Sequence, residues 1–178
     1  MTSSLAPLVN FLGCDPRRVE IAPHSDRWGD CFLLLASVTA VRCCTLHHIG
    51  STAVRGLPAK PVIDGLMLYT AAGDLEQIAA HLKGLGFVRG SVISAFTPED
   101  VFSLRDESGR EICRIHAMLA GNPAATAMLR FRDALRNSTE LAWSYFMLKR
   151  ALAAAHPDSR EDYCRGKAEF VTKVLNRS

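Results

Sequence analysis

The sequence predicts an α/β (α+β) fold in which helices pack on a mixed β-sheet and the C-terminal third is entirely helical. Up to about residue 119, apolar segments of strand length are interspersed with amphipathic helical segments. After the turn residues at 121–123, only helical periodicity is found. A chain of 178 residues with 48% hydrophobic and 22% charged residues is large enough to cover both faces of one sheet.

The N-terminal region contains Pro7, Gly13 and Pro16, which interrupt regular structure. We therefore expect an irregular N-terminal arm over residues 1–20 and a single domain over residues 21–178. Within this domain the pattern predicts strands at 45–49, 62–69, 87–96, 101–105 and 111–119, and helices at 28–42, 74–85, from 122 onward, 139–155 and 158–176.

Local signals support several of these elements. Residues 107–110 provide the turn of a hairpin between the last two strands. The strand at 62–69 is apolar without alternation, which predicts that both of its faces are covered and that it is central in the sheet; Asp64 is its single polar exception. N-cap signals precede four of the predicted helices: Ser25 or Asp26, Asp74 with Gln77, Asn122 with Pro123, and Asp158 with Glu161.

Composition and charge argue against several classes of protein. The net charge of +3 and the pI of about 8.6 come without a cluster of Lys and Arg, which argues against nucleic-acid binding. Residues 1–12 lack the basic start of a secretory signal, and the longest apolar run, 31–41, is about half the length that spans a bilayer. We therefore expect a cytoplasmic protein with no membrane partner. The six cysteines include no C-x-x-C pair, so we expect reduced thiols and no zinc or disulfide framework.

The most informative segment spans residues 47–64, where a predicted strand runs into a Gly-Ser turn and a second strand then carries a carboxylate. Gly50 lets the backbone turn sharply and approach a ligand closely. Ser51 and Thr52 offer hydroxyl and successive N–H groups that can surround a phosphate. A structural alternative stays open, because Gly, Ser and Thr are also the residues that any tight turn favours.

Asp64 on the second strand could hold Mg²⁺ against such a phosphate, and Lys60 and Arg55 would add positive charge. An ionised carboxylate inside an apolar strand costs several kcal/mol unless it is paired or bound to a metal. The alternative for Asp64 is a buried carboxylate that accepts hydrogen bonds from backbone N–H groups.

Two better-known phosphate motifs are absent. The segment after Gly50 lacks the Gly-Lys-Ser/Thr of a P-loop. The glycines at 84, 86 and 90 miss the dinucleotide-binding spacing by one residue and follow a helix, whereas the Rossmann fingerprint follows a strand. We therefore expect neither a P-loop enzyme nor a Rossmann enzyme.

Residue spacing adds candidates outside this segment. Alternation along the strand at 111–119 places Arg114 and His116 on one face and Cys113, Ile115 and Ala117 on the other. Residues four apart in a helix lie on the same helix face. Three such pairs can either present donors to an anion or remain solvated: Arg132 with Arg136, Tyr145 with Lys149, and Tyr163 with Lys167.

The segments 48–54 (His-Ile-Gly-Ser-Thr-Ala-Val), 56–57 (Gly-Leu) and 59–64 (Ala-Lys-Pro-Val-Ile-Asp) resemble the signature of the GrpB family, which is assigned to the nucleotidyltransferase superfamily. The similarity extends from about residue 17 to 175, although Arg55 stands where the family commonly has Pro. It implies a nucleotidyltransferase-like fold. It also makes a nucleotide, coenzyme A or another phosphate-bearing small molecule the expected partner, with Mg²⁺ as cofactor.

The resemblance also implies a set of site residues. Active nucleotidyltransferases hold two metals with a pair of acids after the Gly-Ser turn and a third carboxylate on a later strand. Here Leu66 stands at the second acidic position and His116 on the later strand, so the two-metal site is incomplete. The candidate catalytic residues are Asp64 and His116, and the candidate metal ligands are Asp64 and His48. The candidate phosphate or nucleotide ligands are Gly50, Ser51, Thr52, Lys60, Arg132, Lys149, Tyr163 and Lys167.

Two functions remain open on this basis. The leading hypothesis is a nucleotide-binding transferase that moves a nucleotidyl or phosphoryl group to an unknown acceptor with Mg²⁺. The alternative is a catalytically degenerate module that binds a nucleotide, coenzyme A or another phosphate ligand. The missing acid at Leu66 favours binding alone, and the isolated Asp64 favours chemistry.

Overall fold

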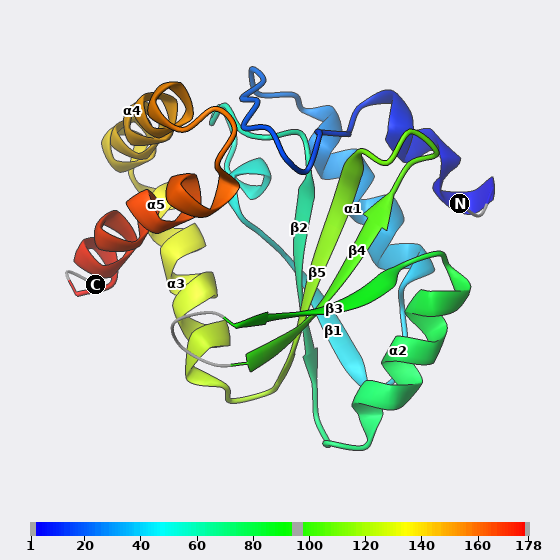
Figure 1. The fold of residues 1–178 in the computed structure, drawn as a ribbon. Helices are drawn as coiled ribbons and strands as arrows, with labels where there is room; N and C mark the ends of the chain where they lie inside the picture. The colour runs from blue at the N-terminus through cyan, green and yellow to red at the C-terminus, as the bar shows by residue number, and fades with distance from the viewer. Residues whose placement is uncertain (1–2, 94–97, 177–178) are drawn as a thin grey trace.

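The computed structural model describes residues 3–93 and 98–176, which form a five-stranded mixed sheet with helices packed on it (Figure 1). The strands are β1 (Cys44–Ile49), β2 (Ile63–Tyr69), β3 (Val88–Ile93), β4 (Pro98–Arg105) and β5 (Glu111–Leu119). The α-helices are α1 (Arg27–Val38), α2 (Asp74–Gly84), α3 (Pro123–Asn137), α4 (Thr139–Ala155) and α5 (Arg160–Leu175), and the 3₁₀ helices are η1 (Ser3–Asn10) and η2 (Ser51–Ala53). The predicted mixed α/β fold with a helical C-terminal third is confirmed.

The strand order is β1-β2-β5-β4-β3, and within this described sheet only the β2–β5 pair is parallel. Strand β2 therefore lies between two neighbours. Each of its faces carries fully buried side chains, namely Ile63 and Met67 on one face and Leu66 on the other. The apolar pattern without alternation predicted this interior position correctly, since a strand covered on both faces needs no polar side.

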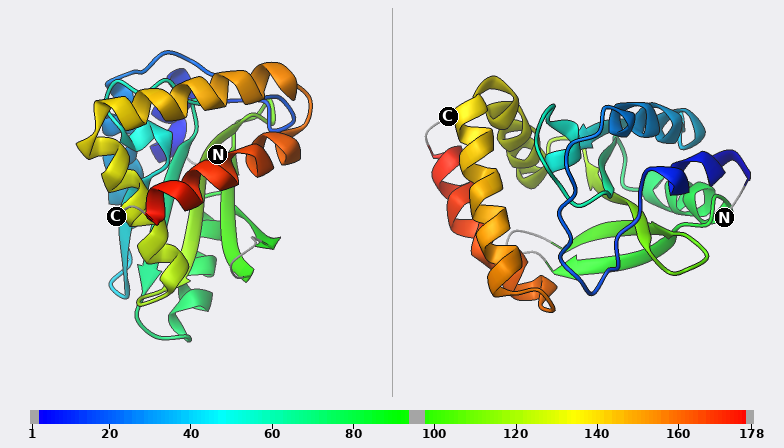
Figure 2. Two further views of the ribbon diagram at one scale, coloured as in Figure 1. Left: turned by 90° about the vertical axis from the view of Figure 1, so that its left-hand side faces the viewer. Right: turned by 90° about the horizontal axis from the view of Figure 1, so that it is seen from above.

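The two faces of the sheet are covered differently (Figures 1 and 2). Helices η1, α1 and α2 pack on one face, over the largest hydrophobic cluster. Helix α3 packs on the other face through a smaller cluster, and α4 and α5 stack against α3 through a third one. This second face buries fewer apolar side chains, and the polar residues of β2 and β5 described below lie on it.

The interpretation of residues 1–20 as an irregular arm is wrong for residues 3–10. Residues Ser3–Asn10 form η1, with Pro7 inside it. Leu5, Leu8 and Leu12 are at most 3% exposed and belong to the main hydrophobic cluster, and Cys14 pairs with β5 through a β-bridge. The proline and glycine exclude a long α-helix, but a 3₁₀ helix still turns its leucines toward the sheet.

The helix boundaries confirm some of the cap signals and correct others. The Asn122 side chain accepts a hydrogen bond from the Ala124 N–H at 2.8 Å, as its position before Pro123 predicts. Asp74 is the first residue inside α2 and accepts from the Ala71 N–H before the helix, so the predicted capping box is wrong.

The last helix is also capped differently. Its N-cap is Ser159, whose hydroxyl accepts from the Asp162 N–H at 3.3 Å, and not Asp158. Part of the strand predicted at 87–96 lies outside the described residues. No helix in the described part of the chain is long and apolar enough to cross a membrane.

Candidate phosphate-binding site

The Gly-Ser turn follows β1 and approaches β2 closely. Gly50 adopts φ 72° and ψ −173°, a backbone conformation that essentially only glycine occupies. A Cβ atom built on Gly50 would lie 2.6 Å from Oδ2 of Asp64. Glycine is therefore required twice, once for the conformation and once for the space that the Asp64 carboxylate occupies.

Strand register explains why Asp64 lies at this turn. In the antiparallel β1–β2 pair, Asp64 is opposite Ile49, the last residue before Gly50. In the parallel β2–β5 pair, Asp64 is level with Arg114, and His116 lies two residues further along the same face of β5. The predicted alternation along β5 is consistent with burial, because Cys113, Ile115 and Ala117 are in the main core and Arg114 and His116 are only partly buried.

The Asp64 carboxylate accepts no hydrogen bond and forms no ion pair with the part of the chain that the structure describes. Burial raises its pKa above the ordinary value, and the charges of His116 and Arg114 act in the opposite direction. The alternative of a structural carboxylate satisfied by backbone N–H groups is therefore not supported within residues 3–93 and 98–176.

Lys149 on α4 contacts the turn although it lies 98 residues after Ser51 in the sequence. Its Nζ donates to Ser51 Oγ at 3.0 Å and to the Pro58 carbonyl at 2.7 Å, and it lies 5.1 Å from the centre of the Tyr145 ring. The residue is 3% exposed. Burial, and secondarily the charge of Lys167, lowers the pKa of Lys149 to about 7.

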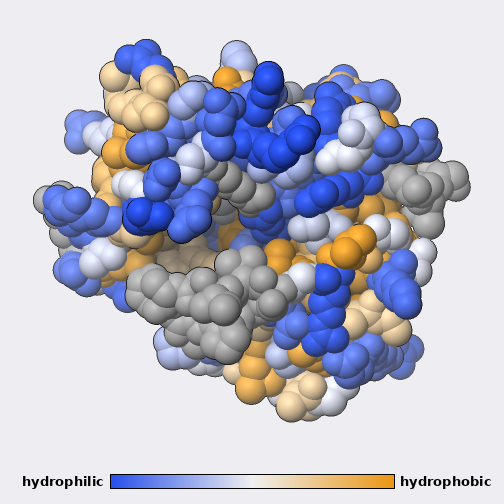
Figure 3. All heavy atoms as spheres, viewed as in Figure 1, coloured by the Kyte–Doolittle hydropathy of each residue, from blue (hydrophilic) through white to orange (hydrophobic). Residues whose placement is uncertain are grey.

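Lys167 from α5 joins the same group of charges. Its Nζ lies 4.4 Å from the centre of the Tyr163 ring, in a cation–π contact. Burial lowers the pKa of Lys167, Asp64 raises it and Lys60 lowers it further, so Asp64 and Lys60 both lie close enough to act on Lys167. In Figure 3, this side of the molecule is hollowed near its centre, between α5 and the sheet, with hydrophilic residues along the upper border.

Sequence reasoning missed an acid–base pair on β5. Glu111 is 2% exposed, forms an ion pair with Arg114 and accepts from the Ser103 hydroxyl at 3.1 Å. A register shift in the β4–β5 pair leaves Ile112 as an extra residue, which turns Glu111 to the face of Arg114. The charge of Glu111 is close enough to Asp64 to raise its pKa.

Arg114 brings a further free donor to this face. Its Nε is buried and has no hydrogen-bond partner within the described residues. A buried N–H without a partner costs about 1–3 kcal/mol, which an incoming acceptor would recover.

Two predicted ligands lie elsewhere. The His48 ring is stacked on Phe32 at 4.5 Å, and its register partner is Gly65, so His48 is on the opposite sheet face from Asp64. Burial lowers the pKa of His48 to about 4. Arg132 pairs with Asp133 and donates to the His48 carbonyl at 3.1 Å. The structure brings neither side chain to Asp64; His48 Nε2 instead lies 3.1 Å from Thr52 Oγ1, on the other side of the turn residues from that carboxylate.

Thr52 lies in the turn, but its hydroxyl is already used. Thr52 Oγ1 is 3.4 Å from the Val62 carbonyl and 3.1 Å from His48 Nε2, and the residue is 5% exposed. Within the described residues, no three His, Cys, Asp or Glu side chains are placed to hold a metal ion together. The arrangement around Asp64 is therefore mainly a cationic pocket with one free carboxylate.

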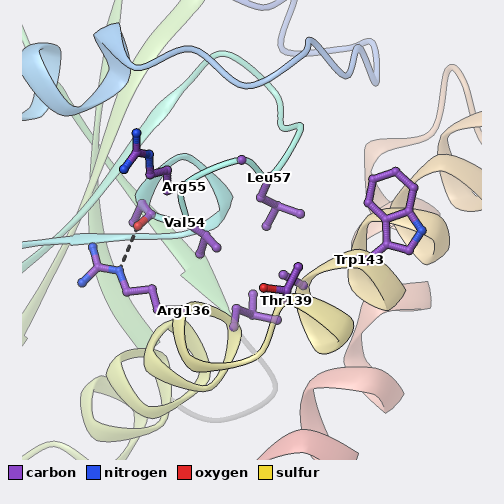
Figure 4. Close-up of a pocket in the computed structure, with 10 residues that line it drawn as sticks. Val54, Arg55, Leu57, Arg136, Thr139 and Trp143 are labelled. Carbon is purple, nitrogen blue, oxygen red and sulfur yellow. Dashed lines mark hydrogen bonds between the residues drawn. The ribbon is translucent and has the colours of Figure 1, made fainter.

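A separate cavity of about 430 Å³ lies on the other side of this turn (Figure 4). Residues 53–57 form one wall, and the corner between α3 and α4 forms the other. Neither Ser51 nor Asp64 lines it. The candidate site therefore lies at the converging charges of Asp64, Lys149 and Lys167, apart from this cavity.

Comparison with solved structures agrees with this fold. A structure of Cid1, a protein with RNA terminal uridylyl transferase activity, superposes with a TM-score of 0.50 at 15% identity, over 72% of this chain and 41% of that one. At this identity the likeness concerns the fold alone. The sheet and its helices therefore have a nucleotidyltransferase-like fold.

The chain belongs to the GrpB family, whose profile, described as GrpB protein, matches residues 18–177. A crystal structure of GrpB from Enterococcus faecalis superposes with a TM-score of 0.73 at 26% identity, over 89% of this chain and 96% of that one. The protein YqkA from Bacillus subtilis is 32% identical over 165 residues, which are 87% of this chain. The chain spans only 46% of the length of YqkA.

Proposed function

We propose that this chain binds a nucleotide or another phosphate-bearing small molecule at the Gly50–Ser51 turn. The proposal depends on one observation above all: Lys149 is buried against Ser51 although 98 residues separate them in the sequence. Burying an ammonium costs several kcal/mol unless it is paired, and no carboxylate is within salt-bridge distance of Lys149 in the described residues. A bound phosphate would supply the missing anion.

The neighbouring groups support the same ligand class. The Ser51 hydroxyl can donate to a phosphate oxygen while Lys149 donates beside it. Lys60 and Lys167 add two cations, and the buried Arg114 Nε adds a free donor. The lowered pKa values of Lys149 and Lys167 reflect burial and the charges of neighbouring cations, both of which an anion would offset.

The choice between binding and transfer depends on the carboxylates. Leu66, at the position of the second acid, is fully buried among apolar residues, and Glu111 is already paired with Arg114. These two facts favour the degenerate binding module. The free Asp64 carboxylate favours transferase activity, which is therefore the second candidate function.

The residues present fit Mg²⁺ only as an ion shared between protein and substrate. Mg²⁺ commonly binds to one or two carboxylates together with substrate phosphates, and Asp64 supplies one unpaired carboxylate. When bound, the ion would neutralise charge on the phosphates. The protein's own contribution would be positioning by Ser51 and Lys149, and His116 stays the predicted proton acceptor on the same sheet face.

The test is calorimetric titration of ATP, UTP and coenzyme A into wild-type protein and into Asp64→Asn, with and without Mg²⁺. Asp30→Asn is the matched control, because Asp30 is an exposed carboxylate on α1. Ligand at one hundred times its Kd stabilises the fold by about 2.7 kcal/mol, which raises Tm by roughly 5–10 °C for a chain of this size. Release of pyrophosphate or phosphate measures turnover in the same samples.

The outcomes separate the candidates. Mg²⁺-dependent binding and turnover that are both lost in Asp64→Asn support the transferase. Binding without turnover, in all variants, supports the module. If none of a broad panel of phosphate ligands binds or raises Tm, the proposed function is refuted.

A further inference from the structure

The cavity between residues 53–57 and the α3–α4 corner has the dimensions of a ligand site. Its volume of about 430 Å³ lies within the range of about 300–1,000 Å³ that is usual for small-molecule sites. Its apolar lining comes from Val54, Leu57, Leu135 and Ala142. Because it is lined by neither Ser51 nor Asp64, it needs an explanation of its own.

One end of the cavity carries an open aromatic ring. Trp143 on α4 lines the cavity and is 58% exposed, whereas Trp28 is 1% exposed in the core. Phe146 lies against Trp143 at 5.0 Å in a tilted arrangement. An exposed indole beside an apolar wall is a surface on which a planar ring stacks well.

Two arginines line the other end of the cavity, with their guanidinium groups turned outward toward solvent (Figure 4). In Figure 4, Arg55 and Arg136 lie on one side of the view and Trp143 on the opposite side, with Leu57 and Thr139 between them. Arg136 Nε donates to the Ala53 carbonyl at 2.9 Å, which fixes the group at the cavity wall and leaves its two terminal nitrogens for other acceptors.

Each arginine forms a long ion pair in the described residues. Asp133 Oδ1 is 4.0 Å from Arg136 but only 2.8 Å from Arg132. Asp26 Oδ1 is 4.0 Å from Arg55, so neither contact is a hydrogen bond that would use up the guanidinium donors. Two guanidinium groups match the charge of a phosphate monoester, about −1.5 to −2, better than that of a single carboxylate.

We propose that this cavity is a second ligand site, which takes a nucleoside monophosphate with its base on Trp143 and its phosphate at Arg55 and Arg136. The same chemistry occurs in a free mononucleotide and in the terminal nucleotide of a short strand. Neither Asp64 nor Ser51 lines this cavity, so the second site does not depend on the function proposed for the Gly50–Ser51 turn.

The experiment follows the fluorescence of Trp143 during titration with UMP, with excitation at 295 nm. UMP should quench the wild-type emission saturably, and Trp143→Leu should show no saturable change because only the buried Trp28 remains. Calorimetry should show affinity about 5- to 100-fold weaker in Trp143→Leu, the range expected for loss of one stacked base. Arg55→Gln should weaken UMP about two- to fivefold, and Arg17→Gln, at an exposed arginine outside the cavity, should not.

Three further samples define the ligand. Uridine, which lacks the phosphate, and ribose 5-phosphate, which lacks the base, should each bind more weakly than UMP. If the dinucleotide pUpU binds more tightly than UMP, the natural ligand is the terminal nucleotide of a strand. Asp64→Asn should leave the quenching of Trp143 by UMP unchanged, because Asp64 does not line this cavity. The proposal is overturned if UMP causes no saturable quenching, or if Trp143→Leu and Arg55→Gln both bind UMP as the wild type does.

Discussion

Substitution of Gly50 by alanine tests the close approach of the turn to Asp64. At φ 72° and ψ −173°, an L-residue costs about 1–3 kcal/mol in backbone strain. The new methyl group would also lie 2.6 Å from Oδ2 of Asp64, which must turn away. For a chain of 150–250 residues, each kcal/mol lowers Tm by about 2–4 °C, so the strain alone predicts a loss of roughly 2–12 °C.

Because Gly50→Ala also displaces the Asp64 carboxylate, it should affect ligand binding as well as stability, whereas backbone strain alone would affect only stability. Gly109→Ala is the matched control, because Gly109 also has a positive φ, +83°, but an added Cβ meets no atom within 4 Å. Gly109→Ala should lower Tm and leave ligand affinity unchanged. Gly50→Ala should lower Tm and also abolish any Mg²⁺ dependence of nucleotide binding, measured by calorimetry.

A double-mutant cycle with Asp64→Ala separates strain from collision. Removing the carboxylate leaves the strain at position 50 but relieves the collision, so the Gly50→Ala penalty should fall by about 0.5–3 kcal/mol in the Asp64→Ala background. Additive effects, together with unchanged Mg²⁺-dependent binding in Gly50→Ala, would refute the argument that the turn and the carboxylate form one site.

Three further predictions concern Lys149, Ser51 and Leu8. Between pH 7 and 10.5, the unfolded chain binds a proton at Lys149 that the folded chain has released, so the contribution of Lys149 to stability rises with pH across this range. Phosphate affinity should fall as pH rises above about 7, and Lys149→Met should bind weakly without that slope, in calorimetry from pH 6 to 9. Ser51→Ala should change stability by only about 1 kcal/mol yet weaken phosphate binding measurably; unfolding with unchanged affinity would mean a structural turn. Leu8→Ala should cost about 2–5 kcal/mol in urea unfolding, because Leu8 is 1% exposed, and an unchanged midpoint would restore the irregular-arm interpretation.

Much of the fold follows from local signals in the sequence. The covered faces of β2, the Asn122 cap and the three C-terminal helices each depend on residues close together in the chain, which periodicity and cap chemistry describe well. The N-terminal region shows the limit of such signals. Pro7 correctly argues against an α-helix, but burial of the neighbouring leucines depends on the distant sheet surface that they cover.

Residues of the candidate site could be proposed from the sequence where they stand out locally. Residues whose position depends on how the strands pair could not. Gly50 and Asp64 stand out because each breaks the pattern of its surroundings. Glu111 reaches the site only through an extra residue in β5, and no feature of the sequence marks that bulge. His48 was misplaced because its sheet face relative to Asp64 is set by the β1–β2 register, a pairing across a turn whose geometry the sequence does not specify.

The basic and acidic side chains near the Gly50–Ser51 turn determine whether Mg²⁺ can bind alone or only together with a nucleotide. The site holds four basic side chains, namely Lys60, Arg114, Lys149 and Lys167, and two carboxyl groups, those of Asp64 and Glu111. This excess of basic groups disfavours a lone divalent cation, whereas a nucleoside triphosphate brings its own negative charge to the site. Titration of Mg²⁺ alone should therefore produce no binding heat, and titration of Mg²⁺ into the protein with ATP should produce heat that Asp64→Asn removes. Tight binding of Mg²⁺ to the protein without nucleotide would contradict this argument, because it would require a carboxylate cluster that the described residues do not form.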